Sequence, residues 1–166
     1  MHRSIVIEGP DNSGKSTLAK NLSKILKFPI IKAGPPPKSN SLILTCCDLQ
    51  YFWMLDRPCI FDRITPISHQ CYNDLDEQCI NYLNSKLYDM RPMFILIYCN
   101  VKFNFTQENY ESDNDKKIVE DRYEKVIEKY RKIMLTNRAE IIFSGKIDSV
   151  INDLTSMGVS IDGQSS

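Results

Sequence analysis

The sequence predicts an α/β protein, in which helices flank both faces of a five-stranded parallel sheet in three layers. Short apolar runs alternate with longer segments whose apolar residues recur at helical spacing. The run at 93–99 is apolar throughout, as expected of a strand that is covered on both faces. A glycine-containing segment joins the first apolar run directly to the first helical segment. Strand and helix alternation of this kind favours parallel pairing.

The first half of the chain supplies three strands and two helices. The β-like run 4–7 predicts the first strand, and the short apolar runs 29–31 and 59–61 predict the next two. A first helix is expected at 16–26, where one face holds Leu18, Leu22, Ile25 and Leu26. A second helix is expected at 42–53, where the apolar stripe is Leu42, Cys46, Leu49 and Trp53.

The second half supplies two strands and three helices. Strands are expected at 93–99 and 139–143, and helices at 75–87, 116–134 and 149–157. The first of these helices has an apolar face formed by Leu75, Cys79, Tyr82, Leu83 and Leu87. The long helix has one formed by Val119, Tyr123, Val126, Tyr130 and Ile133, and both tyrosines are expected in the core. Loops are expected at 34–40 and at the polar stretch 104–115.

Length and composition limit the kind of protein this is. The 166 residues suffice for one domain, expected at 1–161 with a flexible tail at 162–166. Lys plus Arg and Asp plus Glu number 21 each, so the net charge of zero argues against nucleic-acid or anionic-membrane partners. No apolar run reaches the length of about 18 residues that suggests a membrane span, and no signal peptide is recognisable.

Cysteine usage points to a reducing compartment. The six cysteines form no CxxC pair, and there are two histidines, so neither a zinc site nor a secreted disulfide framework is expected. We therefore expect reduced, mostly buried cysteines in a cytoplasmic protein.

The segment Gly9-Pro10-Asp11-Asn12-Ser13-Gly14-Lys15-Ser16 matches the phosphate-binding pattern GxxxxGK[ST]. It lies between a predicted strand and a predicted helix, where backbone N–H groups and the helix dipole attract phosphate. Lys15 is expected to reach the β- and γ-phosphates of ATP, and the Ser16 hydroxyl to bind Mg²⁺. The fold is therefore predicted to be a P-loop NTPase fold. The residues assigned to nucleotide binding are Gly9, Asn12, Ser13, Gly14, Lys15, Ser16 and Thr17.

Three charged residues suggest a second substrate. Asp11 is an acid inside a phosphate loop, so it either contacts a sugar hydroxyl or caps local N–H groups. Asp62 and Arg63 follow the third strand, whose carboxyl end should lie beside Lys15. Asp62 is a candidate Mg²⁺ ligand or base, and Arg63 a candidate for the acceptor phosphate. A surface ion pair is the alternative for these two.

The chain resembles nucleoside monophosphate kinases of the thymidylate kinase type, including compact virus-encoded ones. The residues that carry the resemblance are IVIEGPDNSGKSTLAKNLS at 5–23 and IFDRITPISHQCY at 60–72. Weaker similarity at 141–154 suggests the adenine-side loop and closing helix. The resemblance implies that Asp11 contacts the acceptor sugar, that Asp62 and Arg63 form the Asp-Arg pair, and that Ser68 and Tyr72 contact the acceptor.

The sequence departs from the family pattern in three ways. Ile64 replaces the usual aromatic residue, and Ser68 lies one position further from Asp62 than usual. The expected lid at about 104–117 has no arginine, which leaves Lys116, Lys117 and Arg122 as catalytic cations. The compact region before the third strand suggests a reshaped base pocket, with candidates Phe52, Trp53 and Tyr72 and with Arg57 as a second phosphate contact. His69 is expected to be an exposed histidine.

Together these features predict transfer of the ATP γ-phosphoryl group to a deoxynucleoside 5′-monophosphate, dTMP or a related pyrimidine, with Mg²⁺. One alternative is a kinase for nucleosides or a polynucleotide 5′-hydroxyl, with Asp62 as base. Others are an inactive acceptor-binding relative and a nucleotide-dependent regulatory protein, although no NKxD motif is present. The expected partners are small nucleotides, and the apolar face of 42–53 would suit a homodimer.

Overall fold

The computed structural model describes residues 3–34, 37–100 and 112–161 and contains a five-stranded, all-parallel sheet. The strands are β1 (Ser4–Glu8), β2 (Ile30–Lys32), β3 (Ile60–Asp62), β4 (Phe94–Cys99) and β5 (Ile141–Phe143). Their order across the sheet is β2-β3-β1-β4-β5. The helices are α1 (Lys15–Leu26), α2 (Asn40–Asp56), α3 (Thr65–Tyr72), α4 (Glu77–Met90), α5 (Asp113–Thr136) and α6 (Ile147–Ser156), with a 3₁₀ turn η1 at Arg91–Met93.

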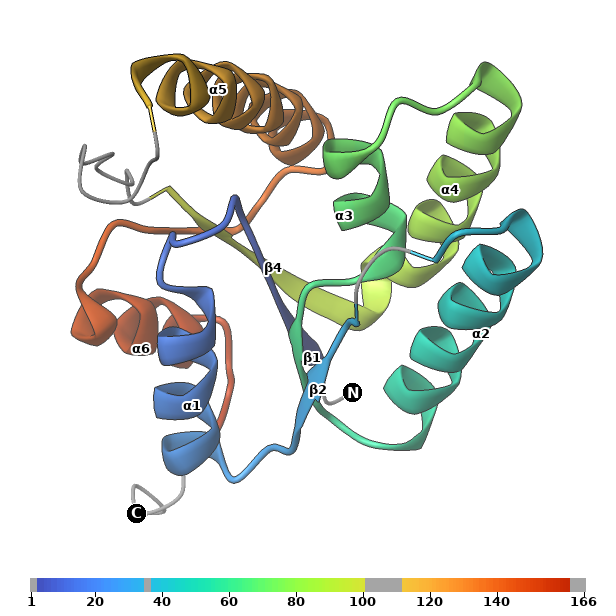
Figure 1. Cartoon of the computed structure of the whole chain (residues 1–166). Coiled ribbons are helices and arrows are strands. Elements are labelled where there is room, and N and C mark those ends of the chain that lie inside the picture. The colour runs from blue at the N-terminus through green and yellow to red at the C-terminus, as the bar shows by residue number, and fades with distance from the viewer. Residues whose placement is uncertain (1–2, 35–36, 101–111, 162–166) are drawn as a thin grey trace.

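Helices cover both faces of the sheet, so the predicted three-layer α/β architecture is confirmed (Figure 1). Alternate residues of β1 serve the two faces. Ile5 and Ile7 pack with α1 and α6, whereas Val6 packs with residues of α3, α4 and α5 on the other side. Every residue of β1 and β4 is buried, which explains why the run at 93–99 carries no polar alternation.

One helix was not predicted, and the bounds of the others differ from the sequence prediction by up to three residues. The helix α3 was not predicted, because its eight residues contain no repeat long enough to show periodicity. The helix α5 begins at Asp113, three residues before the predicted start, because the Ser112 side chain accepts a hydrogen bond from the N–H of Asp115. The rest of the expected loop, 104–111, and the expected tail, 162–166, lie outside the described residues.

The apolar stripe of Leu42, Cys46, Leu49 and Trp53 on α2 does not face the core. Leu42, Leu49 and Trp53 are 40–53% exposed, while the buried residues of the helix are Ile43, Cys47, Gln50 and Met54. The apolar residues of this helix lie on all its faces, so their spacing in the sequence could not identify the face that packs against the core. The helix instead turns Gln50, a polar residue, toward the interior.

The carboxyl ends of β1 and β3 lie side by side, because Ile7 pairs with Asp62 in the parallel register. This register places the loop after β1 next to the residues that follow β3, as predicted. All six cysteines are free, and four of them are buried. Among the described residues, no helix is both long enough and apolar enough to cross a bilayer.

Candidate active site

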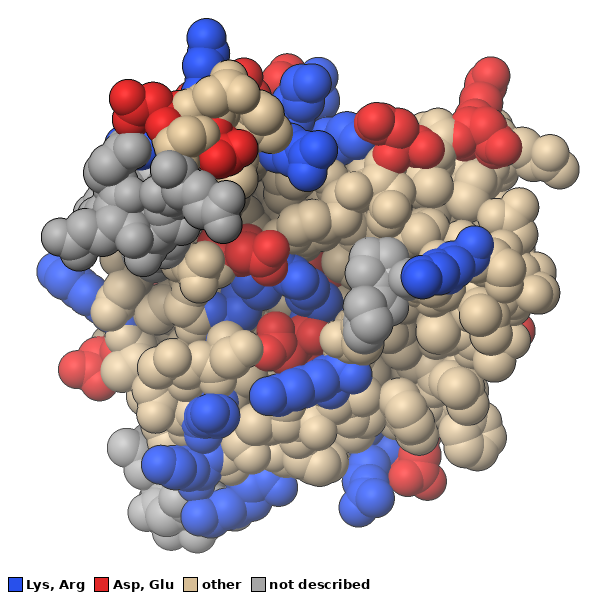
Figure 2. All heavy atoms as spheres, viewed as in Figure 1, with Lys and Arg blue, Asp and Glu red and all other residues tan. Residues whose placement is uncertain are grey.

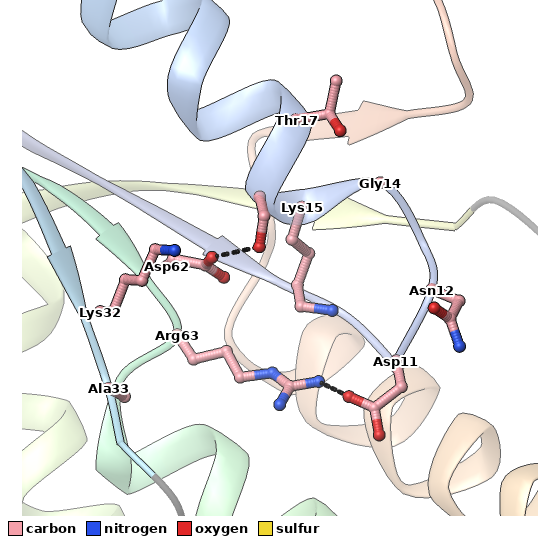
Figure 3. Close-up of a pocket in the computed structure, with 10 residues that line it drawn as sticks. Asp11, Asn12, Gly14, Lys15, Thr17, Lys32, Ala33, Asp62 and Arg63 are labelled. Carbon is pink, nitrogen blue, oxygen red and sulfur yellow. Dashed lines mark hydrogen bonds and ion pairs between the residues drawn. The ribbon is translucent and has the colours of Figure 1, made fainter.

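A cavity of about 570 Å³ opens at the carboxyl edge of the sheet, between the loop after β1 and the end of β3 (Figure 3). Three cationic side chains line it, from Lys15, Lys32 and Arg63, together with the carboxylates of Asp11 and Asp62. Figure 2 shows Lys and Arg atoms gathered near the middle of this face, with Asp and Glu atoms among them. A chain without net charge thus has a locally cationic cavity suited to an anion.

The loop after β1 turns sharply enough to reach over this cavity. Asn12 and Gly14 adopt left-handed backbone angles, with φ of 57° and 86°, and α1 begins directly after Gly14. Gly9 lies so close to β4 that an added Cβ would be 2.5 Å from the Cys99 carbonyl oxygen. Both glycines of the motif are therefore required by the path of the backbone.

Lys15 extends along the inside of this loop. Its Nζ donates hydrogen bonds to the carbonyl oxygen of Pro10 at 2.6 Å and to Ser13 Oγ at 3.4 Å. Burial lowers the pKa of Lys15, and the nearby charge of Arg63 lowers it further. An incoming phosphate would relieve this repulsion between the two cations.

Ser16 and Asp62 come together from α1 and β3. The Ser16 hydroxyl donates a hydrogen bond to Asp62 Oδ2 at 2.7 Å. A hydroxyl and a carboxylate oxygen beside a phosphate loop form the oxygen donor set that Mg²⁺ prefers, completed by water and substrate phosphates. Within the described residues no cluster of three or more His, Cys, Asp or Glu could hold a metal by itself. These two residues therefore fit a Mg²⁺ ion that arrives with a nucleotide.

Arg63 also lines the cavity. Hydrogen bonds from one nitrogen of its guanidinium group, Nη2, to three oxygen atoms hold the side chain in place. Its Nη2 donates to Asp11 Oδ1 at 2.6 Å, to the Tyr72 hydroxyl at 2.7 Å and to the Gly9 carbonyl oxygen at 3.3 Å. The guanidinium carbon also lies 4.7 Å from the centre of the Tyr72 ring. The sequence segments 5–23 and 60–72 are therefore in contact in the folded protein, through the ion pair between Asp11 and Arg63 (Figure 3).

The Arg63 backbone is unusual in a way that favours a role in binding. Its φ of 73° is left-handed, which non-glycine residues seldom adopt unless the surroundings enforce it. The buried Nε–H of Arg63 has no hydrogen-bond partner among the described residues. Burial opposes the charge on Arg63, but the oxygens of Tyr130, Tyr72 and Asp11 raise its pKa above the ordinary value. The guanidinium therefore keeps its charge.

Glu8 is buried next to the residues of the site, and the sequence analysis did not single it out. It is fully buried at the end of β1, where it accepts hydrogen bonds from the Ile64 N–H at 2.7 Å and the Tyr130 hydroxyl at 3.0 Å. Burial raises its pKa to about 7, although Arg63 partly opposes that rise. An acid that ends an otherwise apolar strand and directly precedes the phosphate loop was the available signal.

The acidic residue of the loop, Asp11, is also contacted from α5. The Tyr123 hydroxyl donates to the Asp11 carbonyl oxygen at 3.2 Å, so the expectation that Tyr123 is a core residue is wrong. Tyr130, by contrast, is fully buried as predicted. Burial acts to raise the pKa of Asp11, but the hydrogen bond and charge of Arg63 lower it below its usual value.

A second cavity, of about 180 Å³, adjoins the first and shares Lys32 and Ala33 with it. Trp53 and Ser68, both predicted as acceptor contacts, line this second cavity. His69 lines it too and is 4% exposed, so its expected exposure is wrong. The helix α3 brings His69 inward, and since that helix was not predicted, its buried face could not be.

Several predicted residues are not brought to the first cavity. Arg57 follows α2 and precedes β3, so it lies toward the amino ends of the strands, where it pairs with Asp56 at 3.5 Å. Phe52 is 65% exposed on α2. Three cations of α5 were predicted to be catalytic, and among the described residues they do not line this cavity either; they are Lys116, Lys117 and Arg122. Lys116 forms an ion pair with Glu120 at 3.7 Å.

Several solved structures, kinases among them, share this architecture. The YorR protein from Bacillus subtilis, in complex with phosphorylated GDP, matches with a TM-score of 0.61 at 23% identity, over 93% of this chain and 94% of that one. Deoxyadenosine kinase from M. mycoides matches at 0.56 and 19% identity, over 92% and 99% of the two chains. Thymidylate kinase from Ehrlichia chaffeensis matches at 0.56 and 16% identity, over 93% and 97%.

The chain has the fold of P-loop kinases. No protein-family model matches the sequence, and no curated protein matches it significantly. The structural likeness therefore shows the fold, and the chemistry must be argued from the cavity.

Proposed function

We propose that this protein transfers the γ-phosphoryl group of ATP to a deoxynucleoside 5′-monophosphate, dTMP or a related pyrimidine nucleotide. One observation carries the proposal: a phosphate loop with Lys15 and an arginine held in place by Asp11 face the same cavity. A kinase for monophosphates needs cations for both the donor and the acceptor phosphate. A protein that only binds ATP has no acceptor phosphate and so needs no cation for one.

Each residue then has a role that follows from its position. Lys15 and the loop N–H groups hold the donor phosphates, and the guanidinium of Arg63, which lines the same cavity, orients the acceptor phosphate. Ser16 and Asp62 would hold Mg²⁺, which neutralises phosphate charge when it is bound with ATP. The transition state of phosphoryl transfer requires little covalent chemistry from the protein. Alignment of the donor and acceptor phosphates and neutralisation of their charge therefore supply the rate enhancement.

The nucleotide kinases among the structural relatives support the proposal. Thymidylate kinase and deoxyadenosine kinase are kinases for nucleotide or nucleoside acceptors, and the latter was solved with dCMP and dCDP as products. The cavity here is large enough for phosphates from two substrates and continues into a second cavity. This arrangement suits a nucleotide acceptor with a phosphate at one end and a base at the other.

The test is an ADP-release assay with ATP, Mg²⁺ and a panel of acceptors. The panel holds the deoxy- and ribonucleoside monophosphates, the free nucleosides and an oligonucleotide with a 5′-hydroxyl. We expect turnover with one or a few deoxynucleoside monophosphates. Turnover confined to nucleosides or the oligonucleotide, or the absence of acceptor-dependent turnover, would overturn the proposal.

A matched pair of lysine variants on α1 tests the role of the loop. Lys15→Ala should lower kcat by about a hundredfold or more, because the donor phosphates lose a buried cation. Lys20→Ala removes an exposed lysine from the same helix and should leave kcat unchanged. Circular dichroism and thermal unfolding establish that both variants fold. Undiminished turnover in Lys15→Ala would contradict this assignment.

A nucleoside kinase is the second candidate, with Asp62 as the base that accepts the proton of the sugar hydroxyl. The position of Asp62 in the cavity favours it, and so does the likeness to deoxyadenosine kinase. Against it, Asp62 accepts a hydrogen bond from Ser16, next to the loop for donor phosphates. The nucleosides in the acceptor panel distinguish the two candidates directly.

A further inference from the structure

Glu8 is a buried acid to which the proposed reaction gives no role. It ends β1, and its side chain is 0% exposed. Among the described residues, it lines neither of the two cavities, so it does not touch a substrate held there. A buried acid is costly unless its oxygens have partners, and the partners of Glu8 therefore indicate what it does.

The first oxygen of Glu8 holds the backbone next to Arg63. Glu8 Oε1 accepts a hydrogen bond from the Ile64 N–H at 2.7 Å. The preceding N–H, that of Arg63, donates to the Ile7 carbonyl oxygen at 3.0 Å. Two consecutive residues of β1 thus fix the peptide groups on both sides of the Arg63 α-carbon. Because peptide groups are planar, these two contacts together hold Arg63 in its left-handed conformation, with φ of 73°.

The Ile64 N–H lies where neither the sheet nor the next helix provides an acceptor. The strand β3 ends at Asp62, and α3 begins at Thr65 with Ile64 as its N-cap. Ile64 is fully buried, so water does not reach this N–H. A substitution that removes the oxygen at position 8 would therefore leave a buried donor unpaired, which the backbone can avoid only by moving.

The second oxygen of Glu8 supports the side chain of Arg63 through two tyrosines. Glu8 Oε2 accepts a hydrogen bond from the Tyr130 hydroxyl at 3.0 Å. The Tyr130 ring packs edge-on against the Tyr72 ring, with 6.0 Å between the ring centres. Tyr72 lies against the Arg63 guanidinium and accepts a hydrogen bond from it at 2.7 Å. Glu8 is thus connected to Arg63 at both the backbone and the side chain.

We propose that Glu8 is a positioning residue for the acceptor phosphate, which holds Arg63 toward the cavity by accepting hydrogen bonds. This inference rests on the proposed function, in which Arg63 orients the acceptor phosphate. A misplacement of about 1 Å can cost a reaction about a hundredfold. Loss of the oxygens of Glu8 should therefore weaken binding of the acceptor and spare the site for ATP, which Lys15 and the loop after β1 form.

An electrostatic role is the alternative. The charges of Arg63 and Lys15 both interact with Glu8. A role through charge would act on the donor and acceptor sides together, and any neutral residue would abolish it. A role through hydrogen bonding acts on the acceptor side alone, and a neutral residue with an oxygen at the same place preserves it.

Two neutral substitutions at position 8 separate these roles. Glu8→Leu has no oxygen for the Ile64 N–H, so it should raise KM for the monophosphate about tenfold or more and change KM for ATP less than about twofold. Glu8→Gln keeps that oxygen, and its amide nitrogen can donate to the Tyr130 hydroxyl. It should return KM for the monophosphate to within about threefold of the unmodified value. Glu124→Leu, at an exposed position of α5, is the control and should alter neither constant.

Three results would overturn the proposal. Equal rises in both KM values in Glu8→Leu would show that the whole site is disturbed. Equal rises in KM for the monophosphate in Glu8→Gln and Glu8→Leu would assign the role to charge. Unchanged constants in folded Glu8→Leu would show that Arg63 needs no support. If Glu8→Leu does not fold, Tyr130→Phe takes its place, because it removes only the hydroxyl bound to Oε2; KM for the monophosphate should rise selectively, and an unchanged value would contradict the proposal.

NMR of the free protein tests the positioning without any turnover. In the unmodified chain we expect a coupling across the hydrogen bond between the Ile64 amide nitrogen and the Glu8 carboxyl carbon, together with slow rotation of the Arg63 guanidinium. That rotation should become faster in Glu8→Leu and stay slow in Glu8→Gln. Absence of the coupling, or the same rotation in all three proteins, would overturn the positioning role. If these signals are as expected and no monophosphate is phosphorylated, the proposed function fails and the positioning of Arg63 by Glu8 stands.

Discussion

At the scale of single residues, Arg63 links the two halves of the site. Its left-handed backbone and its contacts with Asp11 and Tyr72 hold the guanidinium before any substrate binds. Such preorganisation reduces the entropy lost on binding a phosphate. The effect depends on the planar shape of the group as well as on its charge.

Arg63→Lys separates shape from charge. The lysine keeps a positive charge but cannot reproduce the three contacts of Nη2, so KM for the acceptor should rise about tenfold while KM for ATP changes little. Steady-state kinetics with each substrate varied in turn measures the two constants. Arg57→Lys should change neither, because Arg57 lies toward the other edge of the sheet. A rise in KM for ATP alone would contradict this role of Arg63.

Glu8 gives the folded protein a pH-dependent stability. The pKa of Glu8 is about 7 in the folded state and near 4.5 as an ordinary carboxyl. At a pH between these two values the folded state therefore keeps a proton on Glu8 that the unfolded state has released. Stability from this group is complete below about pH 4.5 and is lost as the pH rises toward 7, by about 3 kcal/mol in all.

Glu8→Gln removes the titration and keeps an oxygen for the Ile64 N–H. As the pH rises from 4.5 to 8, the unmodified chain loses stability that the variant keeps. The difference in free energy of unfolding between the two should therefore shift by about 3 kcal/mol in favour of the variant. Urea denaturation at several pH values measures it. Glu124→Gln, at an exposed position of α5, serves as the control and should follow the unmodified chain. Parallel curves for Glu8→Gln and the unmodified chain would show that Glu8 has an ordinary pKa.

At the scale of elements, the loop between β1 and α1 depends on close packing against β4. An alanine at position 9 would place its Cβ 2.5 Å from the Cys99 carbonyl oxygen and 3.0 Å from Ser13 Oγ. Both neighbours belong to the frame that shapes the loop, so the loop or the strand has to move.

Gly9→Ala should therefore lower the free energy of unfolding by about 2 to 4 kcal/mol and impair ATP binding. Gly34→Ala is the matched control, because an added Cβ there meets no heavy atom within 4 Å. Chemical denaturation measures the stabilities. Equal stability of the two variants would show that the loop accommodates a side chain at position 9.

At the scale of the whole molecule, α2 presents apolar side chains to solvent. On the side away from the second cavity, Leu44, Tyr51 and Leu55 are 38%, 38% and 61% exposed, and Phe52 is 65% exposed. An apolar patch of this kind on a charged surface suggests a protein interface. We expect a second copy of the chain to cover it.

Sedimentation equilibrium should accordingly give twice the chain mass of 19.2 kDa. Leu55→Glu should shift the protein to the monomer at the same concentration, because a buried carboxylate in the interface is unfavourable. Leu135→Glu alters a residue of α5 that is 82% exposed and should leave the mass unchanged. A monomeric unmodified chain would contradict the expectation of a dimer.

The sequence by itself determined the α/β class, the five parallel strands and the phosphate loop, because each depends on local signals. Apolar runs, helical spacing and the GxxxxGK[ST] pattern are contained within a few consecutive residues. Sequence reasoning also chose the right ends of β1 and β3, since carboxyl ends of parallel strands meet at one edge.

Only the tertiary structure decided which face of α2 is buried, that α3 forms, and that Glu8, Gln50 and His69 lie inside. The reason is physical: a helix that is apolar all round, or only eight residues long, has no periodic signal that identifies its inner face. Burial of a polar residue depends on partners distant in sequence, such as Tyr130 for Glu8. Such contacts exist only after the chain has folded, and they give this cavity its chemistry.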